Sequence, residues 1–399
     1  MSTRCIGEVA ELLRGVTYGK NDTTDSTAPD ALPLLRATNI TETGLVLTDL
    51  VFIPARLAKP EQRVQKGDIV ITMSSGSASV VGRSVLVDEP IDATFGAFCG
   101  VLRASDQVLD RYLSYMIRAP QVRQCWSDVA RGTNINNLKR EDVLQTAILV
   151  PPLVEQQRIV AKLDAIDANL WKLSERLDAE LLQSTQLLVS VADELFAGAS
   201  GTSTALGEVC HLATGGTPST HNRSFYESGE IKWLRSGDVH MREIRDCEGR
   251  ITAAGMVSAN TKFLPLNSVL IALAGQGKTR GTVAMLRTQA TCNQSVVSIM
   301  PQDVKFLIPE FVYWYLRSKY DEIRRLTGDD GKDRRGLNMR IIRGLEVPVP
   351  PMTEQERIVA RLDEMQSVCA KVSANIERRK AKAGELHQSV LAAASRGAL

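Results

Sequence analysis

One short stretch of the sequence has the composition of a phosphate-binding loop. Residues 274–279 read Ala-Gly-Gln-Gly-Lys-Thr and follow an apolar run that predicts a strand. The full pattern requires a glycine five residues before Gly277 and a helix after the loop, so that backbone amides surround a phosphate. Ala272 occupies that position, and residues 282–286 have the pattern of another strand. A nucleotide-binding enzyme that uses Gly277-Lys278-Thr279 therefore stays an alternative interpretation, although the sequence lacks both the first glycine and the following helix of the pattern.

Other side chains that could support catalysis are scattered along the chain. The four histidines have no spacing typical of metal ligands, and the seven cysteines include no Cys-x-x-Cys pair. The sequence has no glycine fingerprint for a methyl donor and no Asn/Asp-Pro-Pro-aromatic motif of an amino-methyltransferase. We expect no catalytic site, no metal and no cofactor. The scattered cysteines also indicate reduced thiols and a cytoplasmic protein.

The basic residues are concentrated in one part of the chain. The net charge of the 399 residues is only +2, but residues 199–349 contain 20 Lys and Arg against 15 Asp and Glu. Such an asymmetry is consistent with an anionic partner, but taken alone it favours an ordinary solvated surface. No apolar run of about 18 residues occurs, so we expect no membrane span.

The elements that must position these residues are arranged as an internal repeat. Residues 151–164 read PPLVEQQRIVAKLD and residues 350–363 read PPMTEQERIVARLD, and ten of the fourteen positions are identical. Weaker similarities continue at nearly the same offset. The chain is therefore predicted to contain two copies of a unit of about 200 residues, each a mixed segment followed by a helical one.

Each helical segment has the apolar spacing of a coiled-coil seam. The positions repeat at intervals of four and three residues from Ile159 to Leu177 and from Ile358 to Ile376. A Pro-Pro pair precedes each helix, and residues 353–356 of the second copy fit a capping box. Two amphipathic helices packed in separate domains would give this pattern. We favour antiparallel pairing of the two helices, which would act as a spacer between two globular units.

The mixed segments are predicted to be α+β with short strands. The predicted strands are residues 66–73, 80–87, 95–102, 268–274, 281–286 and 295–300, and the predicted helices are residues 112–118 and 311–317. The frameworks of the two copies match, whereas the loops at 131–136 and 328–335 differ. Different loops on one shared framework are what two domains that recognise two different sequences would need.

The repeated blocks closely resemble the conserved regions of the specificity subunits of type I restriction–modification systems. The segment 385–397 resembles that family's closing segment, and Leu35-Arg36…Asn39-Ile40, Leu234-Arg235-Ser236-Gly237-Asp238-Val239 and Lys66-Gly67-Asp68-Ile69-Val70-Ile71 resemble framework motifs of its target recognition domains. The second copy departs from the last motif, because Asn267-Ser268 replaces Gly-Asp.

The resemblance implies two similar α/β target recognition domains, separated by two long antiparallel coiled-coil helices and related by a pseudo-two-fold repeat. The implied segments are 1–150 and 199–349 for recognition, and 151–198 and 350–399 for the helices. It implies a non-catalytic subunit that reads a bipartite, asymmetric sequence in double-stranded DNA for both methylation and restriction. Two methyltransferase subunits and, in the full complex, restriction subunits would be its partners, with no membrane. A coiled-coil scaffold without a DNA role is the other alternative.

If the chain reads DNA, basic side chains should contact phosphates, and polar side chains should contact base edges. The candidates in the first copy are Arg36, Thr38, Asn39, Ser75, Ser77, Arg131, Thr133, Asn134 and Asn136. The candidates in the second copy are Arg235, Ser236, Gln276, Lys278, Arg280, Arg334, Arg335, Asn338 and Arg340. The residues expected to bind partner proteins are Glu155, Gln156, Arg158, Glu354, Gln355 and Arg357.

The double variant Arg334→Ala with Arg335→Ala should weaken DNA binding and reduce its salt dependence, because each phosphate contact releases counterions. Titrations of DNA with the assembled complex at several salt concentrations measure both quantities. If the affinity and the salt slope stay unchanged, this loop does not contact the DNA backbone.

Overall fold

The computed structural model describes residues 2–42, 44–131, 136–240, 242–275, 277–327 and 336–399, and these form two compact units. The first unit combines Met1–Leu177 with Glu377–Leu399, and the second is Asp178–Ile376. Each unit therefore contains one globular segment and a part of each of two long helices, α5 (Leu153–Ala197) and α11 (Met352–Ser395). No helix in the described part of the chain is long and apolar enough to cross a membrane.

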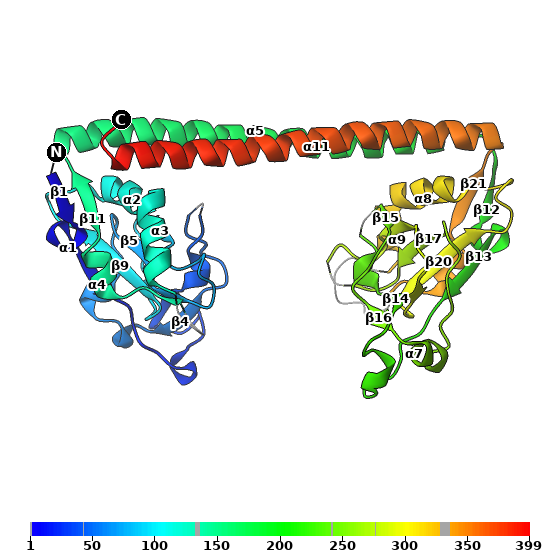
Figure 1. Ribbon diagram of the computed structural model, residues 1–399, viewed down its shortest axis with the longest axis horizontal. Coiled ribbons are helices and arrows are strands. Elements are labelled where there is room, and N and C mark those ends of the chain that lie inside the picture. The colour runs from blue at the N-terminus through cyan, green and yellow to red at the C-terminus, as the bar shows by residue number, and fades with distance from the viewer. Residues whose placement is uncertain (1, 43, 132–135, 241, 276, 328–335) are drawn as a thin grey trace. The chain divides into compact units, whose positions relative to one another are not determined.

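The first unit contains two main sheets (Figure 1). The larger is antiparallel in the order β2 (Ala10–Arg14), β9 (Cys99–Ala104), β5 (Ile69–Thr72) and β7 (Ser84–Leu86). The smaller has the order β4 (Val51–Pro54), β3 (Ala31–Leu35) and β8 (Thr94–Phe95). Short pairs join β1 (Ser2–Cys5) to β11 (Ala147–Val150) and β6 (Ser74–Ser75) to β10 (Asn136–Asn137). The helices are α1 (Ile6–Val9), α2 (Asp110–Arg118), α3 (Pro120–Val129) and α4 (Arg140–Leu144).

The second unit repeats the two main sheets, with one strand added to the larger sheet. Its larger sheet has the order β13 (Cys210–Thr214), β20 (Val296–Pro301), β17 (Val269–Ala272), β18 (Val283–Leu286) and β15 (Glu243–Ile244). The smaller has the order β16 (Arg250–Ile251), β14 (Ile231–Leu234) and β19 (Thr291–Cys292), and β12 (Thr202–Ala205) pairs with β21 (Glu346–Val349). The helices are α6 (Leu206–Val209), α7 (Ala253–Ser258), α8 (Pro309–Ser318), α9 (Tyr320–Arg325) and α10 (Met339–Arg343).

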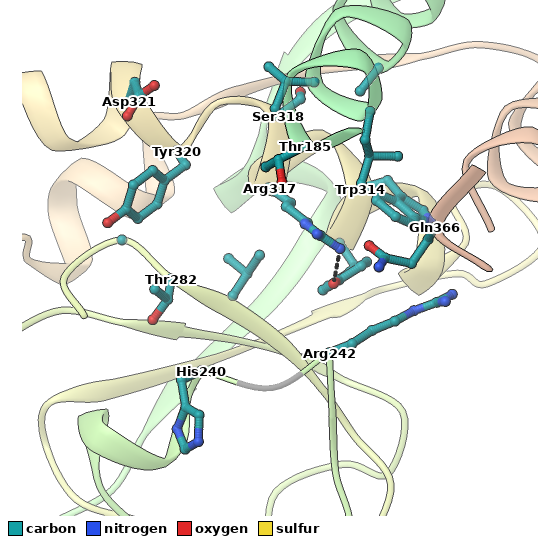
Figure 2. Close-up of a pocket in the computed structure, with 16 residues that line it drawn as sticks. Thr185, His240, Arg242, Thr282, Trp314, Arg317, Ser318, Tyr320, Asp321 and Gln366 are labelled. Carbon is teal, nitrogen blue, oxygen red and sulfur yellow. Dashed lines mark hydrogen bonds between the residues drawn. The ribbon is translucent and has the colours of Figure 1, made fainter. Parts of the chain in front are cut away.

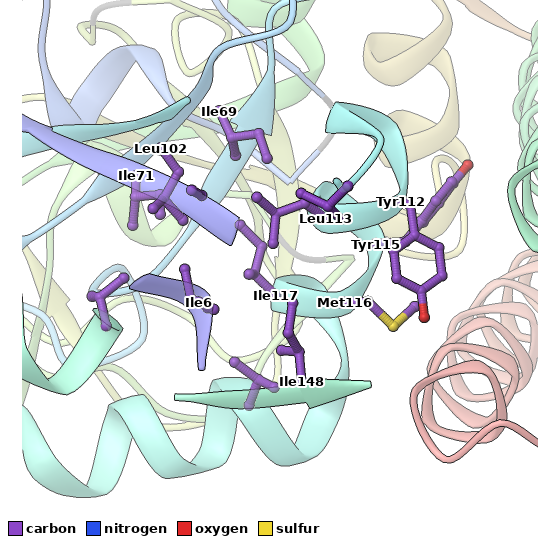
Figure 3. Packing of buried hydrophobic residues seen from close by; sticks show 14 of the residues in the cluster. Ile6, Ile69, Ile71, Leu102, Tyr112, Leu113, Tyr115, Met116, Ile117 and Ile148 are labelled. Carbon is purple, nitrogen blue, oxygen red and sulfur yellow. The ribbon is translucent and has the colours of Figure 1, made fainter. Parts of the chain in front are cut away.

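The central strand β5 shows why an uninterrupted apolar run forms a strand here. Ile69 and Ile71 pack into a core with Leu113 and Ile117 of α2, and Figure 3 shows these side chains facing one another. Val70 points to the opposite face, where a second core surrounds it. Because both faces of the strand are covered, every position is apolar and the polar alternation of a half-exposed strand is absent.

The two long helices pair antiparallel within each unit. In the first unit, Lys162 Nζ donates to the carbonyl of Leu399 at 3.0 Å, so the beginning of α5 lies beside the chain's end. In the second unit, Cys369 Sγ donates to the carbonyl of Ser184 at 3.4 Å. The fold class expected from the repeat is confirmed. The expected capping box is wrong, because α11 begins at Met352 and Thr353 already lies inside the helix.

A glutamine of the repeated block joins each long helix to its globular segment. Gln156 is fully buried; its Oε1 accepts from the Leu109 amide at 2.8 Å, and its Nε2 donates to the carbonyls of Gln107 (3.1 Å) and Pro151 (2.8 Å). In the second unit Gln355 is equally buried. Its Oε1 accepts from the Ile308 amide at 3.0 Å, and its Nε2 donates to the carbonyls of Phe306 (2.8 Å) and Pro350 (2.9 Å).

An aspartate at the end of the same block makes a second junction. Asp164 accepts from the Tyr115 hydroxyl at 2.7 Å and from Arg111 Nε at 2.8 Å. Burial raises the pKa of Tyr115, and the hydrogen bond to Asp164 adds to that effect, so the phenol stays protonated and donates. In the second unit Asp363 accepts from Trp314 Nε1 at 2.9 Å. A phenol in one unit and an indole in the other thus serve as equivalent donors.

The departure at Asn267-Ser268 keeps the turn and removes an ion pair. Gly67 has a φ of +91°, and Asn267 has a φ of +66°, a left-handed conformation that asparagine tolerates. In the first unit the buried Asp68 accepts from Arg103 through Nε and Nη2, both at 2.8 Å. Ser268 is buried in the second unit and carries no charge, so that unit retains the turn without the ion pair.

Substitution of Gln156 by alanine should lower the free energy of unfolding of the first unit by about 1–3 kcal/mol, because it leaves buried backbone groups without partners. Urea unfolding followed by tryptophan fluorescence measures the change. Gln124→Ala is a matched control, since Gln124 is exposed on α3 and should leave the midpoint unchanged. Equal effects of the two substitutions would contradict the structural role of Gln156.

Candidate nucleic-acid interface

In the first unit, the ends of strands β3, β5 and β8 lie close together. Leu35 of β3 pairs in parallel with Phe95 of β8, and the Gly96 amide donates to the Leu35 carbonyl at 2.9 Å. The amides of Met73 and Ser74, which follow β5, donate to the carbonyl of Phe98 at 2.8 and 3.1 Å. The loops that carry the predicted residues Arg36, Thr38, Ser75 and Ser77 therefore start from one edge of the two sheets.

Asn39 holds the turn that presents Arg36 and Thr38. Its Oδ1 accepts from the Arg36 amide at 2.9 Å, and its Nδ2 donates to the carbonyl of Val46 at 2.9 Å. The side chain is only 2% exposed, so it has no polar atom available for a base. The expectation that Asn39 contacts DNA is thus replaced by a positioning role. Thr38 is exposed, and Arg36 donates through Nη2 to the Asp49 carbonyl at 3.0 Å.

The next two loops of the first unit are tied together by a short β-pair. Ser75 of β6 pairs with Asn136 of β10, and the side-chain Nδ2 of Asn136 donates to the Gly76 carbonyl at 3.3 Å. The exposed Ser77 shares a hydrogen bond of 2.9 Å with Ser79. Arg131 is 69% exposed and pairs with Asp128 at 3.0 Å. Ser75, Ser77 and Asn136 therefore belong to one polar patch, whereas Thr133 and Asn134 lie outside the described residues.

The second unit repeats the strand-end arrangement with different side chains. The Asn293 amide donates to the Leu234 carbonyl at 2.9 Å, and the Leu273 amide donates to the Ser295 carbonyl at 2.8 Å. Asp238 takes the place of Asn39, since its Oδ2 accepts from the Arg235 amide at 2.7 Å. Arg235 is exposed after β14, and Ser236 is half-buried beside it.

The glycine-rich loop of the second unit is held by helix α9. The Gly277 carbonyl accepts from Arg324 Nη1 at 2.8 Å, and the Lys278 carbonyl accepts from the Tyr320 hydroxyl at 2.5 Å. Lys278 is exposed and Arg280 half-buried. A phosphate-binding loop is followed by a helix, whereas strand β18 follows this loop in the described chain, which argues against the alternative of a nucleotide-binding loop.

The remaining candidates of the second copy divide between described and undescribed residues. Asn338 caps α10 by accepting from the Ile341 amide at 3.1 Å, and Arg340 is exposed on the same helix. Gln276, Arg334 and Arg335 lie outside the described residues.

The residues expected to bind partner proteins fall into two groups. Glu155 and Arg158 form a surface ion pair of 2.5 Å at the start of α5, and Glu354 and Arg357 lie 3.7 Å apart at the start of α11. Gln156 and Gln355 are fully buried, which corrects the expectation that they contact a partner. Sequence comparison of the two blocks could not separate these roles, because both kinds of residue are identical in the repeat.

Several polar and charged residues near these surfaces were not predicted. In the first unit, a pocket of about 360 Å³ is lined by Arg14, Ser74, Asn137, Lys139 and Arg140. The adjacent pair Lys139-Arg140, separated by two residues from the variable 131–136 loop, was a visible signal in the sequence. Arg14 had none, because only the pairing of β2 with β9 brings it to this edge of the sheet.

In the second unit, a pocket of about 440 Å³ combines arginines with an aromatic ring (Figure 2). The guanidinium carbons of Arg317 and Arg242 lie 4.9 and 5.4 Å from the centroid of Trp314. His240 and Thr282 also line this pocket. Asp363 partly neutralises it by pairing with Arg242.

Three buried cysteines of the described chain have thiols that are unreactive. Burial raises the pKa of Cys99, Cys210 and Cys292 to about 12, so these thiols stay protonated at neutral pH. Among residues that the structure describes, no three His, Cys, Asp or Glu side chains form a metal-binding group.

The sequence profile described as "Type I restriction modification DNA specificity domain" matches residues 1–183 and 202–378. The chain belongs to this family of type I restriction–modification specificity subunits. Its two matched regions correspond to the two copies of the repeat. As a specificity subunit it is a DNA-recognition component and not a catalytic one.

Relatives in the family match over the full length of this specificity subunit. It is 29% identical to the EcoKI specificity subunit of Escherichia coli K12, over 99% of this chain and 88% of the relative. It is 28% identical to the StySPI specificity subunit of Salmonella potsdam, over 100% and 89%. A solved chain described under "Structural basis underlying complex assembly and conformational transition of the type I R-M system" shares the fold, with a TM-score of 0.73, 22% identity and coverage of 100% and 98%.

Replacement of Asn39 by alanine should destabilise the first unit of the specificity subunit by about 1 kcal/mol, because the turn loses its side-chain acceptor. Chemical denaturation gives the size of this effect. Thr38→Ala is the control, since Thr38 is exposed and supports no such turn. A loss of stability in Thr38→Ala as large as that in Asn39→Ala would argue against the positioning role.

Proposed function

We propose that this specificity subunit reads a bipartite, asymmetric sequence in double-stranded DNA, one half with each unit. The observation that carries the proposal is the repeated strand-end arrangement, which presents loops from equivalent positions of both units. Arg36 and Arg235 follow equivalent strands, whereas the loops beyond them differ in sequence. A shared framework with different polar loops would let the two units read different half-sites.

The chemistry of the loops suits this division of labour. Arg131, Lys278, Arg235 and Arg340 are exposed cations that could contact phosphates and set the register on DNA. Ser75, Ser77 and Asn136 could donate or accept hydrogen bonds at base edges. The paired helices α5 and α11 would act as the spacer that sets the distance between the half-sites. The segments 1–150 and 199–349 would be the recognition domains, and 151–198 and 350–399 the spacer helices.

The repeat also supports a proposal for the partners. The surface pairs Glu155–Arg158 and Glu354–Arg357 give this subunit two similar polar surfaces at the beginning of the long helices. Two methyltransferase subunits would dock there, one for each copy of the repeat, and restriction subunits would join the full complex. Methyl transfer and cleavage would belong to those partners, in the cytoplasm, and the same reading would direct methylation and restriction.

Co-expression of the chain with its methyltransferase, followed by genome-wide mapping of methylated bases, tests this proposal. We expect one split motif, and exchange of residues 1–150 for the equivalent segment of another specificity subunit should change only one half of it. Exchange of residues 199–349 is the matched experiment and should change only the other half. A bound and active methyltransferase without sequence-specific methylation would favour the scaffold alternative.

A further inference from the structure

Phe98 is an exposed aromatic side chain on a firmly held backbone. It lies in the loop between β8 and β9, and its side chain is 66% exposed. Its carbonyl accepts from the amides of Met73 and Ser74, and the Cys99 amide donates to the Gly96 carbonyl at 2.8 Å. The loop is therefore fixed by the sheet, while the phenyl ring remains in solvent, where it contributes nothing to the core.

The surroundings of Phe98 are polar and positively charged. Ser74 and Asn137 form a hydrogen bond to each other next to the Phe98 carbonyl. The neighbouring residue Ala97 lines the same pocket as Arg14, Lys139 and Arg140, and no acidic side chain of the described chain lines it. An apolar ring beside hydrogen-bonding groups and cations matches the variety of groups that a DNA groove presents.

The second unit shows that the fold does not require an aromatic residue here. Its equivalent strand β17 is followed by Leu273, whose amide donates to the carbonyl of Ser295 at 2.8 Å, just as the Met73 amide donates to Phe98. Ser295 immediately precedes β20, as Phe98 immediately precedes β9. The backbone contact is shared but the side chain differs, so this backbone arrangement does not require the ring.

We propose that Phe98 makes an apolar contact with the 5-methyl group of a thymine in the half-site that the first unit reads. The thymine methyl is the one apolar group on the base edges of the major groove, and phenylalanine is among the side chains that contact it. Arg14, Lys139 and Arg140 would hold the adjacent phosphates and so bring the ring to the base edge. This inference rests on the proposed function, and it assigns one residue to the reading of one base type.

The test uses the assembled complex with its methyltransferase and a duplex that contains the mapped motif. Each thymine of the first half is replaced in turn by deoxyuridine, which removes only the methyl group. We expect the wild-type complex to lose roughly fourfold in affinity at one position, the size of effect that burial of one methyl-sized group produces. Phe98→Ala should bind the thymine and the deoxyuridine duplex equally, because the two changes remove the same contact.

Two further variants keep the result interpretable. Phe98→Ser installs the side chain that the second unit has at this position, so it should fold and should also lose the thymine preference. Phe263→Ala is the matched control, because Phe263 is an exposed phenylalanine of the second unit and should leave the preference intact.

Several results would overturn the inference. The first is sensitivity to deoxyuridine that persists in Phe98→Ala. The second is a first half-site that contains no thymine on either strand. The third is a loss of affinity in Phe98→Ala that does not depend on which thymine of the duplex is replaced. A 2-aminopurine signal of base unstacking that disappears in Phe98→Ala would instead identify the ring as a wedge between bases. Failure of the proposed function is distinguishable, because the wild-type complex would then show no methylation motif at all.

Discussion

The junction between each long helix and its globular segment depends on one buried carboxamide. A glutamine amide has two donors and an acceptor, and burial is tolerable only when these groups are satisfied. Gln156 meets this requirement with two carbonyls and one amide that come from the helix entry and from the loop before α2. The three hydrogen bonds thus join two backbone segments, the helix entry and the loop before α2, through one side chain. This contact therefore ties the start of α2 to the start of α5, beside the second junction at Asp164.

The same constraint explains which positions stay identical between the copies. Both copies have glutamine and aspartate at these positions because the side chains form hydrogen bonds with the globular segments. The residues are Gln156 and Asp164 in the first copy, and Gln355 and Asp363 in the second. Their bonding partners vary more freely, as the change from Tyr115 to Trp314 shows. Away from this junction the copies diverge, and even the buried ion pair of Asp68 with Arg103 has no counterpart at Ser268. Part of the identity between the copies therefore lies at the contacts that hold the two kinds of segment together.

The repeat, the long helices and the central strands were predictable, because periodic apolar residues report which face is buried. Side-chain roles were less accessible. Asn39 and Gln156 have the residue types of surface contacts, and only their burial and bonding partners show that they are structural. Phe98 and Arg14 were missed for the opposite reason. An isolated phenylalanine or arginine has no period, and its place at the strand ends depends on pairing between strands far apart in the sequence.

The antiparallel helices also determine the order in which the halves can be completed during translation. The second unit is one continuous stretch, Asp178–Ile376, whereas the first requires Glu377–Leu399 in addition to Met1–Leu177. Ile159 and Leu163 therefore cannot pack against Leu391 and Ala394, with which they share a core, until those later residues have been translated. The unit whose residues are translated first is therefore completed last, so a stop codon between positions 377 and 391 would remove part of the first unit's core and leave the second unit whole.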